Sequence, residues 1–101
     1  MGPDSLAALL GRPNVHVYDC NDAELYAEEH VPGARWIEYD HVTAAVLPQD
    51  TSAVLVFYCY SSECPASHSA ALSAHDLGYS HVYFMLEGIL GWMDAGLPTE
   101  P

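Results

Sequence analysis

The sequence contains no lysine, and its only strongly cationic side chains are the two arginines, Arg12 and Arg35. Against them stand 14 acidic residues, which give the 101-residue chain a formal net charge of −12. A surface of this charge repels phosphate backbones and anionic lipids. We therefore expect neither a nucleic acid nor a membrane among the partners of this protein.

Long hydrophobic runs are also absent. No apolar segment approaches the roughly 20 residues that a membrane-spanning helix needs. The first residues of the chain have neither the basic start nor the apolar stretch of a secretory signal. We therefore expect a cytoplasmic protein.

Cysteine is scarce, with only Cys20, Cys59 and Cys64 in the chain. An odd and sparse set does not suit a disulfide framework, so we expect reduced thiols. A metal site is not expected either. Cys59, Cys64 and His68 are candidate zinc ligands, but the sequence offers no clear fourth ligand beside them.

The residues that are present predict one globular α/β domain over residues 1–101. Half of them (50%) are hydrophobic, and no internal repeat is visible. Apolar runs predict strands at residues 15–20, 53–58 and 82–85, with a brief strand at 34–39. Helical patterns lie at 4–11, from 22, weakly at 41–47, and at 65–77 and 88–95. This alternation predicts a central parallel sheet with helices on both faces, and residues 53–58 at its centre.

The segment after the predicted central strand is the candidate site. Cys59 ends that strand, and the chain from Cys59 to Cys64 leads into the helix that begins near Pro65. Ligands of parallel sheets bind at such strand ends, where loop amides and a helix N-terminus favour anions. The helix dipole there would lower the pKa of a thiol, which predicts a nucleophilic cysteine. The alternative is a small buried hydrophobic residue.

A wider pattern resembles the rhodanese-like domains. His30-Val31-Pro32-Gly33-Ala34, placed after Asp19, is similar to the histidine, apolar residue, proline, glycine, alanine signature of that family. Further matching elements follow in order through nearly the whole chain. They are Phe57-Tyr58-Cys59, Ala70-Ala71, Gly78-Tyr79, Val82-Tyr83, Gly88, Trp92 and Ala95-Gly96-Leu97-Pro98.

The resemblance implies a three-layer α/β/α fold with a sheet of about five strands. It also implies that Cys59 is the catalytic residue of a sulfurtransferase, carrying sulfane sulfur as a persulfide. A small sulfur donor and a thiol acceptor, including a protein thiol, are the implied partners, with cyanide as an artificial acceptor and with no cofactor. The implied substrate-binding residues are Tyr60, Ser61, Ser62, Glu63 and Cys64. The implied structural signature is Asp19, His30, Pro32, Gly33, Gly88 and Trp92, in which His30 fixes a turn by hydrogen bonding.

Departures from the family pattern narrow the expected activity. Asn21 and Leu25 stand where the family usually has an arginine and a glutamate, a paired change that we interpret as structural. The loop contains Glu63 and no cation, so we expect thiosulfate, a dianion, to be a poor substrate. Phosphatase relatives need an arginine six places after the cysteine to clamp phosphate. Pro65 stands there, so phosphatase or arsenate reductase activity is not expected.

Two other functions remain compatible with the sequence. Cys64 is either a passive loop thiol or a resolving thiol that closes a disulfide with Cys59. In the second case the chain is a thiol redox protein that cycles this disulfide. The other alternative is a rhodanese-fold interaction module without catalysis. Cys20, next to Asp19 at another strand end, is expected to pack in the core.

Overall fold

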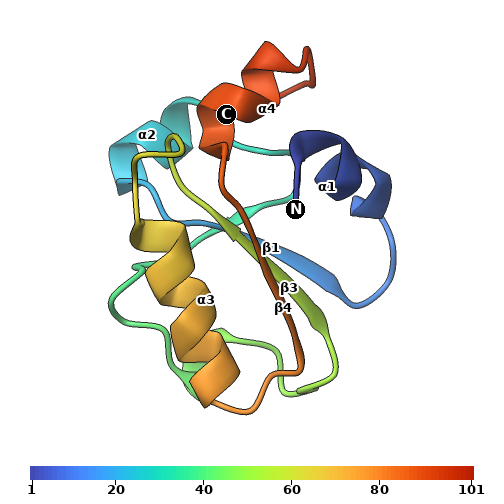
Figure 1. The fold of residues 1–101 in the computed structure, drawn as a ribbon, viewed down its shortest axis with the longest axis vertical. Coiled ribbons are helices and arrows are strands. Elements are labelled where there is room, and N and C mark those ends of the chain that lie inside the picture. The colour runs from blue at the N-terminus through green and yellow to red at the C-terminus, as the bar shows by residue number, and fades with distance from the viewer.

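The computed structural model describes all residues, 1–101 (Figure 1). The elements, in chain order, are α1 (Pro3–Leu9), β1 (Val15–Asp19), α2 (Ala23–Glu28), β2 (Arg35–Trp36), the 3-10 turn η1 (Ala44–Val46), β3 (Val54–Tyr58), α3 (Ala66–Asp76), β4 (His81–Met85) and α4 (Gly88–Asp94). None of these helices has the length and apolar character needed to cross a membrane.

The sheet is parallel throughout and has four strands in the order β2-β1-β3-β4. The expectation of about five strands is therefore too high by one. The chain has only four extended runs, and β2 is reduced to two residues, Arg35 and Trp36. The other strands each have five residues and pair along their full length.

The strand order places a switch point between β1 and β3. From β1 the chain moves outward through α2 to β2, and then returns to β3 on the opposite side of β1. From β3 it moves outward the other way, through α3 to β4. Crossovers in opposite directions leave a crevice beyond the carboxyl ends of the two inner strands. The residues at those two ends are Cys20 and Cys59.

Both faces of the sheet are covered, as the sequence predicts. Side chains alternate along β3, because successive residues of a strand point to opposite faces. Leu55, Phe57 and Cys59 pack against α3 through its alanines, which are Ala66, Ala70, Ala71 and Ala74. Val56 and Tyr58 pack on the opposite face, in a cluster that includes Leu6 of α1 and Ile89 and Trp92 of α4. Cys59 therefore belongs to the α3 face.

Local structure differs from the sequence-based expectations at a few element ends. Pro65 is the N-cap of α3, which covers Ala66–Asp76 and is therefore one residue shorter at each end than the predicted helix. Residues 41–47 form only the short η1 turn. The apolar run at 82–85 predicts a buried strand, but β4 is an edge strand in which only Met85 is fully covered. An apolar run of this length does not reveal whether both of its faces are covered.

A buried polar network ties β1 to β3 on the face opposite Cys59. The carboxyl of Asp19 has no exposed surface. Its Oδ2 accepts a hydrogen bond from the Tyr58 hydroxyl at 2.8 Å, and its Oδ1 accepts one from the Asn21 amide at 2.7 Å. The Tyr58 hydroxyl in turn accepts a hydrogen bond from the Val31 amide at 3.0 Å. Burial raises the pKa of Asp19, and the hydrogen bonds from Asn21 and Tyr58 oppose that rise only in part.

Asp19 should therefore make the fold less stable as the pH rises. Its pKa is raised in the folded protein, so proton binding stabilises the fold fully below the ordinary value of 3.8. That contribution is lost as the pH rises through the folded-state pKa, by about 1.4 kcal/mol for each unit of elevation. Urea unfolding should be measured from below pH 3.8 upward through the raised pKa of Asp19. The free energy of unfolding of Asp19→Asn should improve relative to wild type as the pH increases.

Asp50 provides the matched control. Hydrogen bonds from Ser52 and Asn14 lower the pKa of its exposed carboxyl. Its contribution to stability is present above the ordinary pKa and is lost as the pH falls. Asp50→Asn should therefore lose stability relative to wild type as the pH increases. Identical trends for the two variants would contradict the assigned direction at Asp19.

Candidate active site

Cys59 lies where β3 ends and the loop to α3 begins, as the sequence predicts. Its side chain is 1% exposed, and its backbone is held by the first turn of α4. The amide of Ile89 donates a hydrogen bond to the Cys59 carbonyl at 2.9 Å, and that of Leu90 donates to the Tyr60 carbonyl at 3.0 Å. The start of the loop is therefore fixed by a helix that follows it by almost thirty residues.

Gly88 makes this approach possible. A Cβ at position 88 would lie 2.5 Å from the carbonyl carbon of Tyr60 and 2.7 Å from the carbonyl oxygen of Cys59. The residue also has a φ of +67°, which side chains with a Cβ rarely adopt. The family resemblance includes Gly88 in the signature, and the structure gives the physical reason for a glycine here.

The loop between Cys59 and α3 has backbone amides free to bind an anion. The amides of Glu63 and Cys64 are used inside the loop, where they donate to the hydroxyl and the carbonyl of Ser61 at 3.4 and 3.1 Å. The amides of Tyr60, Ser61 and Ser62 have no acceptor within the protein. Of the five residues expected to bind substrate, these three supply the available donors.

Cys64 is paired with Cys59 in this structure. The two residues form a disulfide across the loop, with their Cα atoms 6.5 Å apart, a separation typical of disulfides. The expectation of reduced thiols is therefore wrong for this pair and holds only for Cys20, because whether the sulfurs of Cys59 and Cys64 meet is decided by the loop geometry and not by their spacing. In this form Cys59 is the buried partner, while Cys64 is half-buried and faces a cleft.

The cleft lies at the switch point between β1 and β3. It is lined by Cys20, Asn21, Asp22, Leu25, Tyr39, Tyr60, Cys64 and Ala66. Asn21 and Leu25, the two departures from the family pattern, thus form part of its wall. Burial, and after it the neighbouring Asp19 carboxylate, raises the pKa of Cys20 to about 12. Cys20 therefore remains a protonated thiol at neutral pH and suits packing better than nucleophilic attack.

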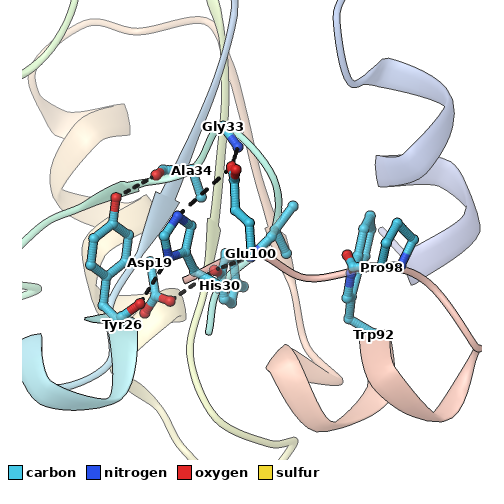
Figure 2. A network of polar contacts seen from close by, with 10 residues as sticks. Asp19, Tyr26, His30, Gly33, Ala34, Trp92, Pro98 and Glu100 are labelled. Carbon is cyan, nitrogen blue, oxygen red and sulfur yellow. Dashed lines mark hydrogen bonds and ion pairs between the residues drawn. The ribbon is translucent and has the colours of Figure 1, made fainter. Parts of the chain in front are cut away.

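Other residues of the signature make hydrogen bonds that join separate segments of the chain (Figure 2). His30 donates from Nδ1 to the Tyr26 carbonyl at 2.8 Å and stacks on the Tyr26 ring, which agrees with a role in fixing the turn. The Gly33 amide donates to Glu100 Oε1 at 2.6 Å. Trp92 donates from Nε1 to the Pro98 carbonyl at 2.7 Å.

Two features near the signature do not follow from the sequence pattern. Glu100 contacts Gly33 across 67 residues, and no sequence signal marks Glu100 as part of the site's support. Pro32 lies in a separate hollow with Leu10 and Arg35, which shares no residue with the cleft beside Cys64. Arg35 also lines a hollow with Glu38 and His41, and neither of its two hollows includes a residue of the loop from Cys59 to Cys64.

The side chains best placed to hold a metal ion lie outside the loop. Ligand atoms of Glu38, Asp40 and His41 are within 4.8 Å of one another, and all three residues are exposed. His68, one of the zinc ligands considered from the sequence, instead packs its ring against Phe84, with the ring centres 5.1 Å apart.

Comparison with known proteins identifies a family. The family profile described as "Rhodanese-like domain" matches residues 2–95. Thiosulfate sulfurtransferase GlpE of Pseudomonas paraeruginosa is 33% identical over 86 residues, which are 85% of this chain and 76% of that protein. The uncharacterized protein slr1261 of Synechocystis is 27% identical over 99 residues, which are 98% of this chain. The chain spans only 54% of the length of slr1261.

A solved structure supports the same fold. BH2092 protein from Bacillus halodurans matches with a TM-score of 0.88 at 24% identity. The match covers 99% of this chain and 74% of that one. At this identity the likeness concerns the fold, and it extends over essentially every element described above.

Replacing Gly88 should disturb the loop directly. We expect Gly88→Ala to lower the free energy of unfolding by about 2 to 4 kcal/mol, from the positive φ and from the forced displacement of the Tyr60 backbone. Gly96→Ala is the control, because Gly96 has a φ of +77° but a Cβ there would meet no neighbour within 4 Å. It should cost only about 1 to 2 kcal/mol. If the two variants lost the same free energy of unfolding in denaturant, a close approach of residue 88 to the Tyr60 backbone would be contradicted.

Proposed function

The chain belongs to the rhodanese-like domain family, and from this premise we propose that it is a sulfurtransferase that carries sulfane sulfur as a persulfide on Cys59. The proposal rests on the position of Cys59. This residue directly follows the inner strand β3 at the switch point and begins a loop whose amides at 60–62 have no partner within the protein.

The proposed reaction has two displacements. The Cys59 thiolate attacks the outer sulfur of a donor, a sulfur–sulfur bond forms on Cys59, and the donor's own sulfur–sulfur bond breaks with its electron pair leaving on the donor remnant. An acceptor thiolate or cyanide then attacks the terminal sulfur of the persulfide. The sulfur–sulfur bond between Cys59 and the terminal sulfur breaks with its electron pair staying on Cys59, which regenerates the thiolate.

The loop supplies electrostatic stabilisation without a charged side chain. The free amides of Tyr60, Ser61 and Ser62 are donors for the negative terminal sulfur. The N-terminus of α3 adds a positive dipole end on the same side. Glu63, in contrast, is exposed in this loop and disfavours a dianionic donor such as thiosulfate.

The disulfide between Cys59 and Cys64 favours a second candidate function, that of a thiol redox protein. An external thiolate would attack the Cys64 sulfur, which faces the cleft, and release Cys59 as a thiolate with formation of a mixed disulfide. A second thiol would then free Cys64. Under the sulfurtransferase proposal the same disulfide is a resting form that must be reduced before sulfur is loaded.

Cysteine variants test the proposal. In pre-reduced protein, Cys59→Ser should abolish thiocyanate formation from glutathione persulfide and cyanide, because serine provides neither a thiolate nor a sulfur carrier. Cys64→Ser should retain the rate within about tenfold, since Pro65 forms the helix cap and the position 64 contact to Ser61 is made by backbone. Cys20→Ala, at the third cysteine, is the control and should retain activity.

The two candidates differ in the behaviour of Cys64→Ser. A redox protein loses its cycle when either loop cysteine is replaced, whereas a sulfurtransferase needs only Cys59. An inactive Cys64→Ser together with a Cys59→Ser that still accepts sulfur would mean that the nucleophile is Cys64 and that its assignment to Cys59 is wrong.

A further inference from the structure

The cleft beside Cys64 continues into a second hollow along the carboxyl edge of the sheet. The two share Cys20, Asn21, Asp22 and Tyr39 in their walls. The second hollow extends from these residues to Trp36, Glu38 and Asp40. Together they form one groove, which we call the edge groove. It begins at Cys64, one sulfur–sulfur bond from Cys59.

The edge groove is acidic, and Arg35 lines an adjoining hollow with Trp36 and Glu38 without forming an ion pair. Asp22, Glu38 and Asp40 lie in its wall and are exposed. All ion pairs of the protein involve histidine, and neither arginine pairs with a carboxylate. At the groove, the ion-pairing histidine is His41, whose Nδ1 lies 3.2 Å from a carboxylate oxygen of Glu38 and 2.9 Å from one of Asp40.

The groove also exposes aromatic surface. Trp36, Tyr39 and Tyr60 are 40%, 44% and 45% exposed, although each carries a large apolar ring. Trp36 is held in place by a hydrogen bond from its Nε1 to the Asn21 carbonyl at 2.8 Å. Exposed aromatic rings beside carboxylates suit lysine and arginine side chains, because the rings attract cations through their faces and pack along the aliphatic stems.

We propose that the edge groove docks a lysine- and arginine-rich segment of a partner protein whose cysteine accepts the sulfur from Cys59. This inference rests on the sulfurtransferase function proposed above and names its acceptor class. In the transfer step the partner thiolate attacks the terminal sulfur of the Cys59 persulfide. The bond to Cys59 breaks with its electron pair staying on Cys59, and the persulfide is then on the partner.

Charge disfavours the other occupants. A second copy of this chain brings a net charge of −12 to a groove that is itself acidic. A nucleic acid or an anionic lipid is repelled in the same way. A basic polypeptide is attracted at long range, and its association is accelerated at low ionic strength.

Peptide binding tests the docking surface without requiring sulfur transfer. The probes are two fluorescent peptides that differ only in whether lysines or glutamates flank a central serine, and their binding is followed by anisotropy in the presence of EDTA. The lysine peptide should bind at least about tenfold more tightly at low salt, and the difference should shrink as salt screens the charges. Equal binding of the two peptides would overturn the inference.

Charge-neutralising variants locate the binding. Asp22→Asn, Glu38→Gln and Asp40→Asn should each weaken binding of the lysine peptide, and the triple variant should abolish most of the preference. Asp76→Asn, which removes one exposed charge at the far end of α3, is the matched control and should have little effect. An effect of Asp76→Asn as large as that of each groove variant would show a response to net charge alone and would overturn the inference.

Cysteine versions of the same peptides then serve as acceptors for persulfide-loaded protein. Faster transfer to the lysine peptide, lost in the triple variant, supports the acceptor assignment. Equal rates for the two peptides would overturn the acceptor assignment while leaving the sulfurtransferase function intact. Failure of Cys59 to load any sulfur would instead refute the sulfurtransferase function, and the peptide-binding result would still decide whether the groove docks basic segments.

Discussion

The first amides of α4 bind the carbonyl groups of Cys59 and Tyr60, and the geometry of the site depends on this contact. The amides of Tyr60, Ser61 and Ser62 donate no hydrogen bond within the protein, so within the loop only the disulfide to Cys64 holds Cys59. A glycine at position 88 lets the backbone of α4 approach close enough to do so. The contact uses only carbonyl groups of the loop, and the amides of residues 60–62 are unpaired and thus available to an anion or a terminal sulfur.

The proposed reactive residue and a stabilising hydrogen bond lie on opposite faces of the sheet at the end of β3. On one face, Cys59 packs beside the small alanines of α3, which allow the helix N-terminus to lie near the loop. On the other face, Tyr58 hydrogen-bonds to the buried Asp19 and joins β3 to β1. Period-two alternation separates these neighbouring residues completely. A change in the register of β3 by one residue would therefore exchange the proposed nucleophile for a structural tyrosine.

Much of this arrangement could be predicted from the sequence, where local patterns and position agree. The continuous apolar run at 53–58 indicated an inner strand, and the alanines after Pro65 indicated the helix that covers it. The exposure of β4 could not be predicted, because a strand at the edge and one at the centre have similar apolar composition. The two-residue length of β2 likewise depends on pairing with β1 rather than on its own sequence.

The site was also predictable only in part, because local sequence does not reveal contacts between distant segments. The position of Cys59 followed from one strand and one helix. The pairing of Cys59 with Cys64, the support of Gly33 by Glu100 and the edge groove all arise from contacts that the local sequence does not encode. Spacing alone left the role of Cys64 open, because a loop of this length can hold two sulfurs together or apart.

The most direct test of the sulfurtransferase proposal is to locate the transferred sulfur. Pre-reduced wild-type protein would be exposed to glutathione persulfide, and the peptide that contains residues 59–64 would be fragmented in a mass spectrometer. We predict one added sulfur atom on Cys59 and none on Cys64. An added sulfur on Cys64 alone, or only the loss of two hydrogens that marks a disulfide between the two cysteines, would contradict the proposal.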